Sequence, residues 1–179
     1  MISLPLADAD GERLAAAPFP TVLLDTSAAS LPSVNIDDRL GGVMSTQHLV
    51  DLGHTRIAFV GEPPNNSFGS VASIRREEGD RRVLQQAGIA PSSELMRYGA
   101  HLRSAAKQMT LDLLSREDPP TATVATSDVQ ATGVMEAATS LGLRVPDDLS
   151  IVASDEIELA SLMELQIEFV VHSTTGPRR

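Results

Sequence analysis

Apolar and polar residues follow two different patterns along the chain. Five short runs are nearly continuously apolar, as is typical of strands buried on both faces: residues 22–24, 57–60, 95–96, 122–125 and 151–153. Between them, apolar residues recur at helical spacing over 38–52, 103–114 and 128–141. Short apolar strands that alternate with amphipathic helices predict an α/β fold with a doubly wound parallel sheet.

Each of these three helices has a predicted apolar face. The face comprises Ala131, Val134, Met135 and Ala138 in the last helix, Ala106, Met109, Thr110 and Leu113 in the middle one, and Leu40, Val43, Met44 and Val50 in the first. Because residues at i, i+3, i+4 and i+7 share one side of a helix, we expect these faces to pack on the sheet.

A glycine follows each of three helical segments, at Gly53, Gly88 and Gly142. Glycine accepts the left-handed conformation that commonly ends a helix, so we predict a helix stop at each position. His54 comes next to the first stop, before the strand 57–60. Sites in open α/β sheets form at the other, carboxyl ends of strands. We therefore predict a structural role for His54 in the turn and not a catalytic one.

Polar residues follow the predicted strands at their carboxyl ends. His101 follows 95–96, Ser127 and Asp128 follow 122–125, and Asp155 and Glu156 follow 151–153. Such groups could line a hydrogen-bonding cleft at that edge. Simpler alternatives exist: Asp128 and Asp155 could be helix N-caps, and His101 an ordinary loop histidine. Arg75 and Arg76 could belong to a solvated helical face.

Composition narrows the class of protein. The 179 residues carry 24 acidic and 14 basic side chains, a net charge of −10, which disfavours direct binding to nucleic acid. Without cysteine there is no disulfide framework or thiolate metal site, which fits a reducing cytoplasm. We see no signal peptide and no membrane-spanning run. Nucleotide-binding, metalloprotease and serine-hydrolase motifs are missing, so we predict neither an enzyme nor a metal or cofactor site.

Several segments, taken in order, carry a family resemblance. They are "PFPTVLLD", "VNIDDRLGG", "HLVDLGHTRIAFVGE", "RREEG", "PPTATVATSDVQATGV" and "GLRVPDDLSIVASDE". They resemble the effector-binding domain of lactose/galactose-repressor-type (LacI/GalR) transcription regulators. The GHTRI and VPDDLS segments are the most specific of these matches.

The resemblance implies a periplasmic-binding-protein-like fold of two doubly wound lobes. A small effector, a sugar or a nucleoside-like molecule, would bind between them, and the protein would be a cytoplasmic homodimer. Residues 1–56 would form part of an incomplete first lobe, 57–160 the second lobe and 161–179 an atypical tail. The helix-turn-helix that reads operator DNA in this family has no counterpart among these residues.

The resemblance also implies roles for individual residues. Arg76 matches the arginine that reaches the effector, and Asp155 the aspartate that accepts hydrogen bonds from effector hydroxyls. Ser127 and Asp128 match a polar pair at the cleft, and His101 a ring that stacks on the ligand. Asp37 would lie on the hinge side of the first lobe. This set, Arg76, Asp155, Asp128, Ser127, His101 and Asp37, is the predicted ligand site.

The sequence departs from the family pattern in three places. Asp80 stands where the family has an aromatic residue, and Ala153 where it has a glycine. After Leu165 the segment "QIEFVVHSTTGPRR" replaces the family's return to the first lobe, which suggests truncation or a frameshift. The alternatives are therefore a periplasmic-type sugar-binding protein and an inactive fragment of a degraded regulator gene.

The charge balance yields a testable prediction about DNA. With a net charge of −10 and no recognition helix, the chain alone should not retain a specific DNA duplex at physiological salt. Fluorescence anisotropy with labelled duplexes from a randomised pool measures this. Tight, sequence-dependent retention would contradict the prediction.

Overall fold

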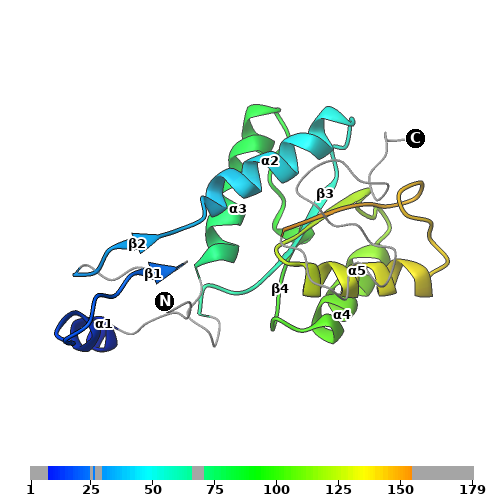
Figure 1. The fold of residues 1–179 in the computed structure, drawn as a ribbon. Coiled ribbons are helices and arrows are strands. Elements are labelled where there is room, and N and C mark those ends of the chain that lie inside the picture. Colours follow the sequence, from blue (N-terminus) through cyan, green and yellow to red (C-terminus); the bar gives the residue numbers. More distant parts are fainter. Residues whose placement is uncertain (1–7, 25, 27–29, 66–70, 155–179) are drawn as a thin grey trace. The chain divides into compact units, whose positions relative to one another are not determined.

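The computed structural model describes residues 8–24, 26, 30–65 and 71–154, which form two compact units (Figure 1). The first comprises 1–37 with 64–71, and the second 38–63 with 72–179. The units divide before residue 38, whereas the predicted lobe boundary follows residue 56. The reason is that the helix after residue 37 packs extensively on a later helix of the second unit. Equating the units with the two lobes stays a prediction.

The first unit holds little regular structure. Helix α1 (Asp8–Ala15) precedes strand β1 (Leu23–Leu24), which pairs in parallel with β2 (Ser33–Val34). The predicted strand at 22–24 is confirmed in its last two residues, and Leu23 is fully buried. Strand β2 was not predicted, because both of its residues are exposed and two residues are too few to show a periodic pattern.

The second unit contains the predicted parallel sheet. Its strands are β3 (Ile57–Gly61), β4 (Met96–Tyr98), β5 (Ala122–Ala125) and β6 (Ser150–Ala153), in the order β4-β3-β5-β6. All three pairings are parallel. These strands confirm the predicted runs, except that Leu95 falls in a short 3-10 turn, Ser93–Leu95, ahead of β4.

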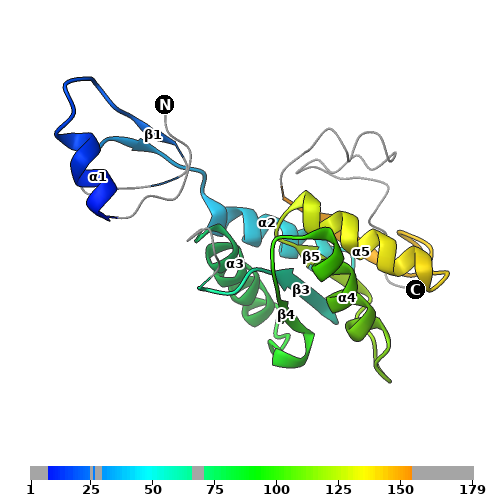
Figure 2. The ribbon, with the colours of Figure 1, turned by 90° about the horizontal axis from the view of Figure 1, so that it is seen from below.

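Two pairs of helices flank this sheet (Figure 2). Helices α2 (Asp38–Asp51) and α3 (Ala72–Gln86) form one pair, and α4 (Arg103–Leu114) and α5 (Asp128–Ser140) the other. Successive residues of β3 serve opposite cores: Ala58 and Val60 join the α4–α5 cluster, whereas Ile57 and Phe59 join the α2–α3 cluster. Burial on both sides explains why β3 is continuously apolar.

Glycines let the helices of each pair approach backbone to backbone. A Cβ added at Gly42 of α2 would lie 2.0 Å from the carbonyl oxygen of Arg76, and one at Gly79 of α3 would lie 2.2 Å from that of Arg39. Gly133 of α5 is equally close to α4, with 2.3 Å to the carbonyl of Arg103. No side chain fits at these contacts, so the sequence must keep glycine there.

This close approach overturns the predicted apolar face of α2. Leu40 is 51% and Met44 46% exposed, whereas α2 is buried mainly through small and polar residues: Asp38, Gly41, Gly42, Ser45, Thr46 and Leu49. The apolar spacing was misleading because α3 needs small residues on the facing side. The predicted faces of α4 and α5 are confirmed by the burial of Ala106, Thr110, Leu113, Ala131, Val134 and Ala138.

The three predicted helix stops and the structural role of His54 are confirmed. Gly53, Gly88 and Gly142 all have positive φ, between 71° and 88°. The His54 ring is 3% exposed, with Nδ1 2.9 Å from Thr121 Oγ1 and Nε2 3.1 Å from Ser150 Oγ. Both hydroxyls lie at the starts of neighbouring strands, so the ring links β3, β5 and β6 at their amino ends.

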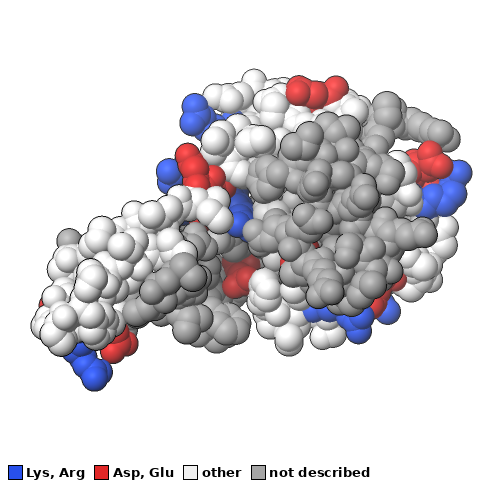
Figure 3. All heavy atoms as spheres, in the orientation of Figure 1, with Lys and Arg blue, Asp and Glu red and all other residues white. Residues whose placement is uncertain are grey.

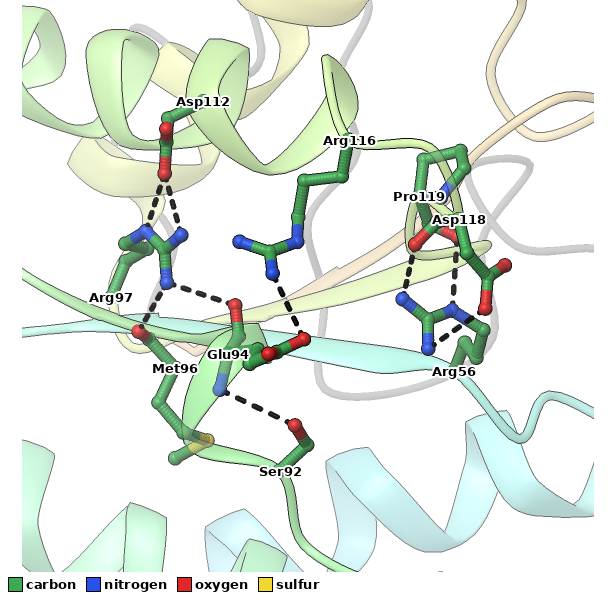
Figure 4. Close-up of polar contacts among 9 residues, drawn as sticks. All are labelled: Arg56, Ser92, Glu94, Met96, Arg97, Asp112, Arg116, Asp118 and Pro119. Carbon is green, nitrogen blue, oxygen red and sulfur yellow. Dashed lines mark hydrogen bonds and ion pairs between the residues drawn. The ribbon is translucent and has the colours of Figure 1, made fainter.

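Arginines tie the connections around the strands together (Figure 4). Arg56, just before β3, donates to the carbonyls of Asp118 and Pro119 and forms a 3.1 Å ion pair with the Asp118 carboxylate. Arg97 of β4 donates to Asp112 of α4. Such half-exposed pairs are each worth little, and their main effect is to fix where the connections lie.

Asp80 is a buried acid between α2 and α3. It is 1% exposed; Thr46 Oγ1 donates to its Oδ1 at 2.7 Å, and Oδ2 has no hydrogen-bond partner among the described residues. Burial raises its pKa from 3.8 to about 6, and the neighbouring Glu77 adds to the effect. A polar group thus lies between the two helices, where its ionised form is poorly solvated.

Asp80 therefore predicts a specific dependence of stability on pH. Because the pKa is higher in the folded chain, the unfolded chain loses its proton first, and folding stability falls as pH rises from about 4 to above 6. Asp80→Asn removes this contribution. As pH rises through that window, the unfolding free energy of the parent should fall relative to that of the variant, by on the order of 3 kcal/mol at most.

Urea denaturation of parent and Asp80→Asn at a series of pH values measures the difference. Asp112→Asn is a matched control, since the Asp112 side chain is 60% exposed and paired with Arg97. A free-energy difference between parent and Asp80→Asn that does not change with pH would show that the buried carboxyl does not titrate in this window.

Candidate functional site

The carboxyl edge of the four-stranded sheet gathers polar side chains from three strand ends and two helices. Glu62 follows β3, His101 follows β4, and Thr126, Ser127 and Asp128 follow β5. Backbone hydrogen bonds extend the strands to this edge: Thr126 N–H donates to the Val60 carbonyl and Gly99 N–H to the Gly61 carbonyl, both at 3.0 Å. The site therefore rests on the sheet itself.

Arg76 of α3 is the buried cation of this edge. It is 8% exposed; its Nε and Nη2 lie 3.0 and 2.9 Å from Asp38 Oδ1, and its Nη1 donates to the carbonyl of Thr126. Asp38, the first residue of α2, is itself 3% exposed. The alternative of a solvated arginine face is wrong for Arg76. The guanidinium instead joins α2, α3 and the end of β5.

Ser127 and Asp128 begin helix α5. The N-cap is Ser127, whose Oγ accepts from the Gln130 N–H at 3.3 Å, so the alternative of Asp128 as N-cap is wrong. Asp128 is the first helical residue, and its Oδ1 accepts from the Val129 N–H at 2.7 Å. A cap and a carboxylate in the first turn both stabilise the positive end of the helix dipole.

Gln130 follows these residues in the first turn of α5 and is fully buried. Its Oε1 accepts from Thr126 Oγ1 at 2.6 Å and from Ser127 Oγ at 3.4 Å. Its Nε2 is buried and has no hydrogen-bond partner in the described part of the chain. A buried amide with half of its capacity unused is costly in a core, and such groups are more common where function needs them.

His101 pairs with Glu62 across the ends of β4 and β3. The distance from Nδ1 to Oε1 is 2.6 Å, and the two side chains are 36% and 11% exposed. Ser73 of α3 fixes the backbone of Glu62, since its Oγ accepts from the Glu62 N–H at 2.8 Å and lies 3.3 Å from the Glu62 carbonyl. His101 thus pairs with a largely buried acid, and the choice between a loop histidine and a ligand-binding one stays a prediction.

The structure brings four of the six predicted site residues to one edge: Arg76, Ser127, Asp128 and His101. Asp37 is exposed and belongs to the first compact unit. Asp155 lies outside the described residues, directly after Ser154, which is buried at the end of β6. The role of these residues in binding a ligand stays a prediction.

Sequence reasoning missed Asp38 and Glu62. Glu62 could have been found, because it stands directly after an apolar strand at the edge where ligands bind. Asp38 gave no usable signal: it adjoins Asp37, and only the packing of α2 on α3 decides which of two neighbouring carboxylates meets Arg76. The difference between them is large, since Asp37 is exposed and Asp38 buried.

Charges elsewhere are mixed. In Figure 3, acidic and basic side chains lie beside each other in several places on the face drawn, with no broad basic area among the described residues. In that same part of the chain no three histidine, cysteine, aspartate or glutamate side chains converge as a metal site would require. No helix there is long and apolar enough to cross a membrane.

The buried Asp38–Arg76 pair yields a prediction that separates two adjacent residues. Asp38→Ala leaves a buried guanidinium without its carboxylate and should lower the unfolding free energy by about 3–5 kcal/mol. Asp37→Ala, on an exposed side chain, should change it by about 0.5 kcal/mol or less. Chemical denaturation followed by circular dichroism measures both, and equal effects of the two substitutions would contradict the assignment.

Comparisons with known proteins agree on one family. Residues 46–172 match the model of the periplasmic binding protein-like domain. The chain is 33% identical over 146 residues to the HTH-type transcriptional repressor PurR of Vibrio vulnificus, covering 80% of the chain and 42% of that repressor. It is 31% identical over 175 residues to the ribose operon repressor of Escherichia coli, covering 88% and 52%. The chain thus spans about half the length of these curated relatives.

Solved structures have the same fold. A transcription regulator from Lactobacillus plantarum matches with a TM-score of 0.80 at 27% identity, over 93% of this chain and 62% of that one. A LacI family transcriptional regulator from Mycobacterium smegmatis matches with a TM-score of 0.70 at 32% identity, over 89% and 59%. These likenesses bear out the predicted α/β, periplasmic-binding-protein-like fold.

Proposed function

Since the chain belongs to the LacI/GalR family of periplasmic-binding-protein-like effector domains, we propose that it senses a small hydroxyl-rich effector for a transcriptional repressor. The observation that carries the proposal is the convergence of polar groups from three strand ends on one sheet edge, the place where α/β folds bind ligands. The effector class is a sugar or a nucleoside-like molecule.

The chemistry of the edge supports such a ligand. Vicinal hydroxyls both donate and accept hydrogen bonds, so they suit a site that offers carboxylates, serine hydroxyls and an imidazole together. Ser127, Asp128 and His101 supply these groups from α5 and the loop after β4. Asp155, at the end of β6 in sequence, would add a second acceptor, as the family motif implies. No catalytic step is part of this role.

We assign Arg76 the role of a positioning residue in the site. Two of its nitrogens hold Asp38 and a third donates to Thr126, the residue before the Ser127–Asp128 pair. The guanidinium thereby fixes the backbone from which the polar pair extends. A ligand that drew on Arg76 would be bound by a cation whose direction is already set, which lowers the entropy lost on binding.

In the whole repressor, the effector would shift a homodimer between states that differ in affinity for operator DNA. Such coupling needs an effector that binds the two states unequally. The curated relatives are named as HTH-type or operon repressors, and this chain matches about half of their length. We therefore propose that DNA is read by a helix-turn-helix outside the matched residues, in the cytoplasm.

The proposal predicts unequal effects of two neighbouring acids. Asp155→Ala should weaken effector binding about five- to hundredfold, because each ligand hydrogen bond left unpaired costs roughly 1–3 kcal/mol. Glu156→Ala should leave affinity nearly unchanged. Isothermal titration calorimetry with a panel of neutral sugars and nucleosides measures both. If no member of the panel bound the parent, or both variants bound equally well, the proposed function would be wrong in this form.

A further inference from the structure

We propose that Glu62 is a positioning residue that fixes the tautomer of His101, so that the ring presents Nε2 as a hydrogen-bond acceptor and the edge takes a hydroxyl- or amine-bearing ligand instead of a phosphorylated one. The inference rests on the proposed function for the existence of a ligand. The state of the ring can be tested without one.

The geometry of the pair carries the first step. A carboxylate can only accept, so the 2.6 Å contact requires the proton on Nδ1 of His101. In a neutral imidazole the other nitrogen is then bare, and Nε2 can accept a hydrogen bond. His101 Nε2 has no protein hydrogen bond among the described residues, and the ring is partly exposed at the edge. It therefore remains available to a donor from outside.

Glu62 is held in place more firmly than a surface acid. Ser73 fixes its backbone from α3. Gly61 before it has no room for a side chain: an added Cβ would lie 2.6 Å from both the Phe59 ring and Ser73 Oγ. The turn that carries Glu62 is thus packed tightly under the edge, and its side chain is only 11% exposed.

The charges of the edge carry the second step. Arg76, the buried cation there, already directs nitrogens at Asp38 and Thr126. The amino end of α5, a common place for phosphate, is capped by Ser127 and carries the Asp128 carboxylate in its first turn. The carboxylates of Glu62 and Asp128 lie at the same edge, and Asp38 already matches the charge of Arg76, so a phosphate that approached these groups would meet acidic side chains.

The test uses nitrogen-15 correlation spectra of the histidine rings in the intact chain, recorded at a pH where the rings are neutral. His101→Asn identifies the His101 signals among the four histidines. We expect parent His101 to be protonated on Nδ1 and bare at Nε2. In Glu62→Ala the ring should revert to the Nε2–H form that free histidine prefers. Glu62→Gln, which keeps an accepting oxygen, should retain part of the parent pattern.

Glu94→Ala is the matched control, because Glu94 pairs with Arg116 on the surface and should leave the His101 signals unchanged. Inorganic phosphate, titrated into the parent to tens of millimolar, should not move them saturably. Parent His101 in the Nε2–H form, no change in Glu62→Ala, or a saturable phosphate response would each overturn the inference. These results do not depend on sugar binding, so a failed calorimetric panel counts against the proposed function alone.

Discussion

A buried guanidinium must have its charge matched and its N–H groups accepted, and that requirement at Arg76 organises the carboxyl edge of the second unit. Meeting it takes the first residue of α2 and the carbonyl that follows β5, two elements far apart in sequence. Once Asp38 and Thr126 are in contact with Arg76, the start of α5 is fixed as well. The polar pair at the start of α5 thus takes its position partly from one buried charge.

That charge lies at its place only because α2 and α3 are nearly in backbone contact. Gly42 faces the carbonyl of Arg76 itself, so the glycine and the arginine belong to the same contact. The second helix pair uses Gly133 in the same manner. Both faces of the sheet are therefore covered by helix pairs whose spacing is set by missing side chains, and the strands between them are largely apolar for that reason.

Much of this fold was predictable because its signals are local or strongly periodic. Continuous apolar runs marked β3, β5 and β6, and glycines marked three helix ends by the one conformation that they accept readily. The face of α2 was not predictable, since its burial is decided by the close approach of α3, which requires small residues such as Gly42 on the facing side. The ion-pair partner of Arg76 could not be predicted for a similar reason. Asp37 and Asp38 are adjacent acids, and only the packing of α2 on α3 decides which of them meets Arg76. Glu62 could have been predicted, because it directly follows β3 at the edge of the sheet where ligands bind.

The hydrogen bonds of His54 have a consequence for how the sheet assembles. Thr121 is 67 positions and Ser150 is 96 positions after His54 in the sequence. Closing such long loops costs more conformational entropy than closing short ones. Contacts within the neighbouring segments α4, β5 and α5 span far less chain. The buried ring can be satisfied on both nitrogens only after β5 and β6 have docked beside β3. His54 therefore stabilises the completed strand order more than a sheet in which only β3 and β5 have paired, where the hydrogen bond to Thr121 alone could form.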